Sequence, residues 1–130
     1  MSRKINVAIL GLGKVGEVFA EHFLSKIQEA QANVQIVAVA ARNTQSPVAL
    51  GFAHNGVTVL DNALDVVKLG DNVDIVFDLT GDAALRKSLR EHMQAANNRH
   101  TVIAPEVMAH LLWAFFDAGS LPESGHSGYD

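Results

Sequence analysis

Three glycines near the N-terminus constrain the fold more than any other feature of the sequence. Gly11, Gly13 and Gly16 have the spacing G-x-G-x-x-G, and they directly follow the apolar run from Ile5 to Leu10. A helical pattern begins immediately afterwards, and this order of strand, glycine turn and helix raises the motif above a chance match. In such a turn the first glycine permits a tight bend, the second lets the backbone approach a pyrophosphate, and the third lets helix and strand pack closely. The sequence therefore predicts a dinucleotide-binding site.

The predicted phosphate site includes the whole glycine loop and the first turn of the helix. Free backbone N–H groups and the positive end of the helix dipole would hold the phosphate there. Lys14 adds a positive charge inside the loop, although a solvated surface lysine is the alternative interpretation. A loop that keeps this turn only for packing, after losing its ligand, is the alternative for the whole motif. The predicted cofactor-binding residues of this loop are Gly11, Leu12, Gly13, Lys14, Val15 and Gly16.

Composition excludes several other classes of protein. A chain of 130 residues is long enough for one domain with a real core. Its net charge of −4 gives no indication of a positively charged surface that would bind nucleic acid or an anionic membrane. The absence of cysteine excludes disulfides and thiolate zinc sites, and the six histidines lack metal-ligand spacing, so we expect no metal. No segment has the length of a signal peptide core or a membrane span, and we expect a cytoplasmic protein.

Apolar runs alternate with helical patterns along the rest of the chain. We expect strands at 4–10, 34–40, 57–60, 73–79 and 100–104, and helices at 14–30, 47–54, 62–70, 83–97 and 105–117. Nearly continuous apolar strands are typical of a parallel sheet that is buried on both faces. The pattern predicts a doubly wound α/β sheet of five parallel strands in the order 3-2-1-4-5. Residues 1–117 would form this single domain, followed by a flexible tail at 118–130.

The loop after the second strand predicts which dinucleotide is bound. In such a fold the ligand lies outside the carboxyl ends of the strands, between the first and the fourth. Ala41, Arg42 and Asn43 stand there, with no carboxylate to accept a hydrogen bond from the ribose 2′-hydroxyl of NAD. An arginine can instead pair with the 2′-phosphate of NADP through two hydrogen bonds. These three residues are predicted cofactor contacts that favour NADP over NAD, unless Arg42 is simply a surface residue.

Thr80 and Gly81 follow the fourth strand, where the ribose and nicotinamide of a bound cofactor would pass. Thr80 is predicted to donate a hydrogen bond to the cofactor, and Gly81 to allow its close approach. The alternative, compatible with the first, is a strand-to-helix connection in which Asp82 caps the next helix. Nothing in the sequence indicates that Asp78 forms an acid–base pair with another carboxylate. Arg86, on the following helix, is expected to be exposed to solvent. No catalytic residue is assigned.

The last predicted helix is apolar on nearly all sides. One face carries Val107, Met108, Leu111, Leu112, Phe115 and Phe116, and the other carries Ala109, Trp113 and Ala114. A helix that is apolar all round is usually covered on both sides. We expect the face with Trp113 to contact a second copy of the chain or another domain. The alternative is that the tail folds back over it.

Three segments together resemble a known family. Ile5 to Gly16, Ile36 to Arg42 and Asp74 to Gly81 resemble the N-terminal NAD(P)-binding domain of homoserine dehydrogenases and dihydrodipicolinate reductases, over about residues 4–104. This resemblance implies a Rossmann-like fold, a bound NAD(P) and hydride transfer to or from a carbonyl or imine substrate. In these enzymes the substrate pocket lies largely in a second domain. Ala41 stands where the family has its NAD-selecting acid, and only 26 residues follow Ala104, so we expect the cofactor half alone.

A second resemblance points to sensing. Asp78 to Asp82 and Val102 to Trp113 are similar to segments of Rossmann-like sensor domains that precede kinase modules in bacterial signalling proteins. That likeness implies ligand binding without turnover. The leading hypothesis is thus a regulatory or sensory NAD(P)-binding module that forms homodimers. The alternatives are a small oxidoreductase or its cofactor-binding subunit, and an interaction protein that has lost the ligand.

Overall fold

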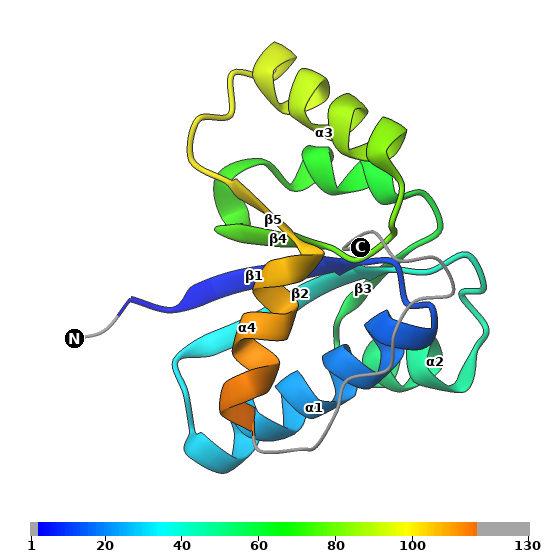
Figure 1. The fold of residues 1–130 in the computed structure, drawn as a ribbon, viewed down its shortest axis with the longest axis vertical. Coiled ribbons are helices and arrows are strands. Elements are labelled where there is room, and N and C mark those ends of the chain that lie inside the picture. Colours follow the sequence, from blue (N-terminus) through cyan, green and yellow to red (C-terminus); the bar gives the residue numbers. More distant parts are fainter. Residues whose placement is uncertain (1–2, 117–130) are drawn as a thin grey trace.

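Five parallel strands form one sheet with helices on both faces (Figure 1). The structure is a computed structural model of the chain, and it describes residues 3–116. The strand order β3-β2-β1-β4-β5 confirms the predicted fold. The elements are β1 (Ile5–Leu10), α1 (Lys14–Ala30), β2 (Val34–Ala40), α2 (Pro47–His54), β3 (Thr58–Leu60), the 3₁₀ helix η1 (Ala63–Asn72), β4 (Ile75–Asp78), α3 (Ala83–Ala95), β5 (Val102–Pro105) and α4 (Glu106–Phe116).

The central strand β1 is buried on both faces because its side chains alternate between two cores. Val7 and Ile9 belong to the core formed with α1, α2 and α4. Ala8 and Leu10 belong to the core formed with η1 and α3. Figure 1 shows the same division, with α3 and η1 above the sheet and the other three helices below it. A strand that is covered on both faces needs apolar residues at nearly every position, which explains the nearly continuous apolar run in the sequence.

An aromatic cluster holds α1 and α4 against the sheet. The ring of Phe19, which is fully buried, lies 5.5 Å from that of Phe77 and 5.9 Å from that of Phe116, centroid to centroid. Trp113 is also buried and makes an edge contact with His22 at 4.9 Å. The prediction that Trp113 faces a partner is therefore wrong, because α4 turns Trp113 toward α1.

The exposed face of α4 consists of other apolar side chains. Val107 is 55% exposed, Leu111 51% and Phe115 80%. The spacing of four residues places these three side chains on one stripe of the helix. The exposed apolar side chains of α4 therefore lie on this stripe, and not on the face with Trp113.

Local signals predicted most element ends. The Ser46 hydroxyl accepts a hydrogen bond from the N–H of Ala49 at 3.2 Å and so caps α2, as expected. The segment expected as an α-helix after Asn62 is instead the 3₁₀ helix η1, which Gly70 interrupts with non-helical backbone angles. Pro105 pairs with Asp78 at the end of β5 rather than opening α4. An edge strand tolerates proline because the missing N–H faces no neighbour. The flexible tail predicted at 118–130, and Asp117, lie outside the described residues.

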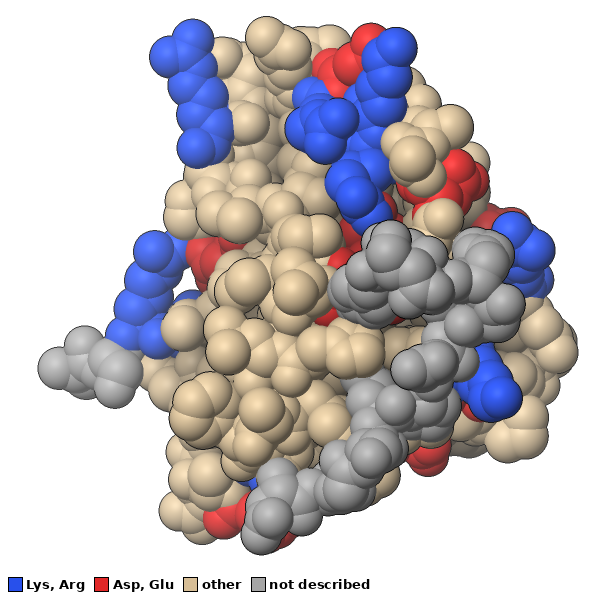
Figure 2. All heavy atoms as spheres, viewed as in Figure 1, with Lys and Arg blue, Asp and Glu red and all other residues tan. Residues whose placement is uncertain are grey.

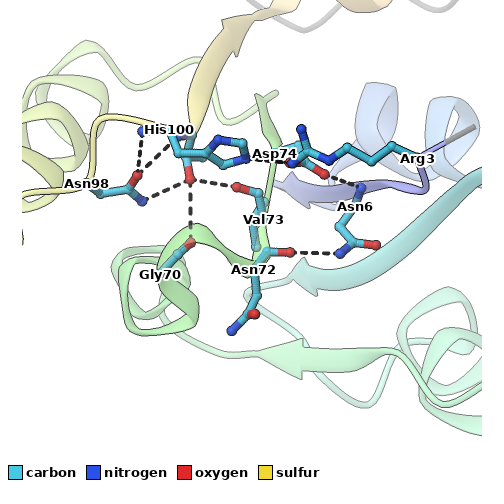
Figure 3. Close-up of polar contacts among 9 residues, drawn as sticks. Arg3, Asn6, Gly70, Asn72, Val73, Asp74, Asn98 and His100 are labelled. Carbon is cyan, nitrogen blue, oxygen red and sulfur yellow. Dashed lines mark hydrogen bonds and ion pairs between the residues drawn. The ribbon is translucent and has the colours of Figure 1, made fainter.

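A polar cluster ties the amino ends of three strands together, and we call Arg3, Asn6, Asp74 and His100 the amino-end cluster (Figure 3). The Asp74 carboxylate accepts a hydrogen bond from the backbone N–H of Asn6 at 2.7 Å and contacts the Nε2 atom of His100 at 2.5 Å. Arg3 pairs with the same carboxylate. The N–H of Asn6, then the His100 ring, then the Arg3 charge hold the pKa of Asp74 below its usual value.

Replacing Asp74 tests this cluster through the pH dependence of stability. A carboxyl group whose pKa is lowered by folding stabilises the fold above its unfolded pKa, and the effect is lost as the pH falls through its folded pKa. We expect Asp74→Asn to lower the urea midpoint at pH 7. The difference from wild type should shrink as the pH falls below the ordinary value of 3.8.

The control is Asp71→Asn, because Asp71 is exposed and has no charged partner among residues 3–116. It should leave the urea midpoint unchanged at both pH values. A midpoint difference for Asp74→Asn that does not depend on pH would contradict the assignment of the lowered pKa.

Candidate functional site

The glycine loop lies at the carboxyl end of β1, between β2 and β4. The backbone N–H groups of Gly11 and Leu12 both donate to the carbonyl oxygen of Ala40, each at 3.0 Å. On the other side, the N–H of Leu79 donates to the Leu10 carbonyl at 2.9 Å. The sheet therefore brings together the three loops that the sequence singled out, because the carboxyl ends of parallel strands share one edge.

Packing alone requires glycine at two positions of the loop. Gly11 has a φ of +91°, and a Cβ atom on it would lie 2.9 Å from the backbone nitrogen of Thr80. A Cβ on Gly16 would lie 1.8 Å from the carbonyl oxygen of Gly11. These two glycines let α1 and the Thr80 loop approach the end of β1.

Gly13 differs from the other two glycines. Its φ is −88°, which any residue adopts, and a Cβ on it would meet no atom within 4 Å. Nothing in the described chain therefore requires a glycine there. The open space in front of Gly13 fits a ligand whose phosphates approach the backbone, as in other glycine-rich phosphate loops.

The start of α1 has the features of an anion site. Gly13 caps this 17-residue helix without any side-chain hydrogen bond, so the N–H groups of the first turn are left for another acceptor. Lys14 is exposed beside them. Leu12 and Val15 are buried in the core, so only their backbone can face a ligand. The pyrophosphate of NAD(P) would be held by these N–H groups.

The loop after β2 places a free cation at the same edge. Ala41 is buried, and its N–H donates to the carbonyl of Leu60 at 3.0 Å. The side-chain oxygen of Asn43 accepts from the N–H of Gln45 at 3.0 Å, which fixes the turn. Arg42 between them is exposed and has no ion-pair partner among residues 3–116. Its guanidinium is therefore available to a phosphate.

Asp78 organises the third loop. This carboxylate is fully buried at the end of β4, and it accepts hydrogen bonds from the Thr80 N–H at 3.1 Å and the Thr80 hydroxyl at 2.6 Å. Its second oxygen pairs with Nε of Arg86 at 3.1 Å. The Thr80 hydroxyl in turn accepts from the N–H of Asp82 at 3.2 Å. Asp82 then caps α3 by accepting from the N–H groups of Ala84 and Leu85.

This network changes how two predicted residues are understood. The hydroxyl hydrogen of Thr80 is already donated to Asp78, so Thr80 can meet a ligand only as an acceptor or through its backbone. Gly81 has a φ of +69° and is exposed. The expectation that Arg86 is solvated is wrong, because a buried carboxylate needs a cation and Arg86 supplies it.

Sequence reasoning missed the role of Asp78, although a signal was present. An aspartate directly after the apolar run 75–77, followed two residues later by threonine, indicates a buried carboxylate that orients a loop. Among residues 3–116, no group of three or more His, Cys, Asp or Glu side chains is placed to hold a metal ion.

Replacing Arg86 tests whether Asp78 depends on it. Arg86→Met leaves an unpaired buried charge and should lower the free energy of unfolding by about 3 kcal/mol in urea denaturation. The double variant Asp78→Asn/Arg86→Met should recover part of this loss, because a neutral amide needs no cation. Lys87→Met on the same helix is the control and should change stability by less than about 0.5 kcal/mol. Equal effects of the Arg86 and Lys87 variants would contradict the role of the ion pair.

Comparisons with known proteins identify chains with a similar fold. The fold is similar to a homoserine dehydrogenase from Thiobacillus denitrificans, with a TM-score of 0.55 and 28% identity over 89% of this chain and 27% of that one. It is also similar to the homoserine dehydrogenase of S. aureus, with a TM-score of 0.60 and 18% identity over 89% of this chain and 30% of that one. This chain thus spans less than a third of the length of these dehydrogenases. A search of curated proteins finds no significant match.

The family model described as the NAD-binding domain of homoserine dehydrogenase matches residues 11–111. That range contains the glycine loop, the Arg42 loop and the Asp78 network. Among residues 3–116, no helix is both long and apolar enough to cross a membrane. The match covers most of the sequence, and the chain therefore belongs to the family of homoserine dehydrogenase NAD-binding domains.

Proposed function

We propose that this chain binds NADP(H) at the carboxyl edge of the sheet, in preference to NAD(H). The open space in front of Gly13 is the observation that carries the proposal, since packing explains the other two glycines of the motif and does not explain this one. The uncapped start of α1 supplies donors for the pyrophosphate. The proposed contacts are the residues predicted from the sequence in the loops at 11–16, 41–43 and 80–81.

The preference for NADP(H) rests on Arg42 and on the lack of a carboxylate in its loop. An exposed, unpaired guanidinium can form charge-assisted hydrogen bonds with a 2′-phosphate. Ala41, which stands at the position of the NAD-selecting acid, is buried and offers no acceptor side chain to a ribose 2′-hydroxyl.

The proposed use of this binding is regulatory or sensory. The two carboxylates of the loop after β4 already have partners: Asp78 is bound to Thr80 and Arg86, and Asp82 caps α3. Neither of these two carboxylates is therefore free to act as an acid or base beside the proposed nicotinamide position. The family likeness favours a second candidate, in which the chain is the cofactor-binding part of an oxidoreductase for a carbonyl or imine substrate. Substrate-dependent loss of NADPH absorbance with aldehydes, semialdehydes or imines would favour that second candidate. A cytoplasmic location stays a prediction of the sequence.

Substituting Gly13 separates ligand binding from folding. Gly13→Ala should leave stability within about 0.5 kcal/mol of wild type, because the new methyl group meets no atom. It should weaken NADPH binding at least about tenfold in calorimetry, since the methyl group takes the space of the pyrophosphate. The control is Gly51→Ala, whose methyl group also meets no atom within 4 Å and which should bind NADPH as wild type does. Wild-type protein that binds no dinucleotide at millimolar concentration would end the proposal.

Substituting Arg42 tests the choice of dinucleotide. Arg42→Ala should weaken NADPH binding by about 10- to 100-fold, the value of charge-assisted hydrogen bonds, and leave NADH binding unchanged. Lys14→Ala is the matched control, because a lysine beside the pyrophosphate should affect both dinucleotides equally. If Arg42→Ala weakens the binding of NADPH and of NADH by the same factor, the guanidinium does not bind the 2′-phosphate.

The exposed stripe of α4 is the proposed homodimer contact. Val107, Leu111 and Phe115 form it, and Val102 of the edge strand β5 is 58% exposed. Leu111→Ser/Phe115→Ser should convert a dimer to a monomer in sedimentation velocity, since it removes two large apolar side chains from the stripe. Leu50→Ser, at a residue of α2 that is 39% exposed, should leave the dimer intact. A wild-type chain that stays monomeric at high micromolar concentration would contradict the homodimer.

A further inference from the structure

A hollow lies at the edge of the sheet opposite the glycine loop. It has a volume of about 510 Å³ and is formed by the end of α3, the loop after it and the start of β5. We call it the α3–β5 hollow. Its lining residues are Arg90, Met93, Gln94, Asn97, Asn98, Arg99, Thr101 and Ile103. This volume is within the range of small-molecule sites.

The charge of the hollow is opposite to that of the chain. Arg90 and Arg99 line it without any carboxylate, in a protein whose net charge is −4. Neither guanidinium has an ion-pair partner within residues 3–116, although Asp71 lines a neighbouring hollow that shares Arg99. Figure 2 shows Lys and Arg side chains on both sides of the surface over α3 and the following loop, with acidic side chains against the right-hand group. Two free guanidinium groups around one hollow favour an anionic ligand.

The loop that carries Arg99 is held in place by its own hydrogen bonds (Figure 3). The side-chain oxygen of Asn98 accepts from the N–H groups of His100 at 3.0 Å and Thr101 at 3.1 Å. Its amide donates to the Thr101 hydroxyl at 2.9 Å, which in turn donates to the Val73 carbonyl at 2.6 Å. The backbone at Arg99 is thus fixed before any ligand arrives, which reduces the entropy that binding costs.

The neutral side chains of the hollow add hydrogen-bond donors. The amides of Gln94 and Asn97 have no hydrogen-bond partner within the described part of the chain, and both line the hollow. Met93 and Ile103 supply an apolar floor. Charged groups at the rim, free amides and an apolar base are the composition of a small-ligand site.

We propose that the α3–β5 hollow binds a small molecule with two or more neighbouring anionic groups, either carboxylates or phosphates. Arg90 and Arg99 pair with separate anionic groups, and Gln94 and Asn97 donate to the remaining oxygens. The site is distinct from the dinucleotide edge, because α3 separates them. The 13 residues of α3 span about 20 Å, from the Asp82 cap near Thr80 to the hollow.

The test is a titration of the ¹⁵N-labelled chain with citrate and, separately, with pyrophosphate at low ionic strength. Binding in the hollow should shift the amide signals of Asn97, Arg99 and Thr101 in a saturable way. Shifts with citrate alone identify a carboxylate ligand, and shifts with pyrophosphate alone identify a phosphate ligand. Shifts confined to Gly13 and Lys14 would place the anion in the glycine loop and overturn the proposal.

Two variants assign the binding to the guanidinium groups. Arg90→Gln and Arg99→Gln should each weaken binding about tenfold, and Lys87→Gln, on the same helix but outside the hollow, should not change it. Unchanged affinity in the Arg90→Gln/Arg99→Gln double variant would also overturn the proposal. These arginines are exposed, so the urea midpoint of each variant should match that of wild type. NADPH binding is measured in a separate titration. If NADPH does not bind, the shifts of the amide signals at 97–101 with citrate or pyrophosphate still decide whether the hollow binds an anion.

Discussion

The close approach of α1 to the end of β1 determines the rest of the structure. A single added carbon on Gly16 would overlap the carbonyl oxygen of Gly11 at 1.8 Å, so the helix can begin there only because the side chain is absent. That contact places the first turn of α1 over the carboxyl edge of the sheet. The dipole and the free N–H groups of the helix then face the space in front of Gly13. Packing and anion binding therefore have a common origin in one backbone contact.

The buried carboxylate of Asp78 fixes the facing side of this edge. Burying a charge is costly unless hydrogen bonds and a counter-charge compensate it. Asp78 obtains both from Thr80 and Arg86, and the result is a rigid connection from β4 through Thr80 to the cap of α3. The glycine loop and the Thr80 loop are thus each held by the protein itself. A pre-organised edge of this kind costs little additional ordering when a ligand binds.

Features that depend on neighbouring residues were predictable, and features that depend on distant contacts were not. The glycine turn and the Ser46 cap follow from local patterns, and the strand order follows from the fold class that the glycine turn indicates. The pairing of Asp78 with Arg86 depends on how α3 is rotated over the sheet, which no nearby residue specifies. The prediction for Trp113 was wrong for a similar reason. A helix that is apolar all round has no polar face to indicate which side is buried. The amino-end cluster joins residues 3, 74 and 100, whose proximity only the folded sheet establishes.

The most direct measurement is a titration of the ¹⁵N-labelled chain with NADPH, followed through its amide signals. If the carboxyl edge binds the dinucleotide, the signals of Gly13, Lys14 and Arg42 shift together and saturate, while those of the amino-end cluster stay in place. Shifts confined to the amino end of the sheet, or none at millimolar NADPH, would contradict the account.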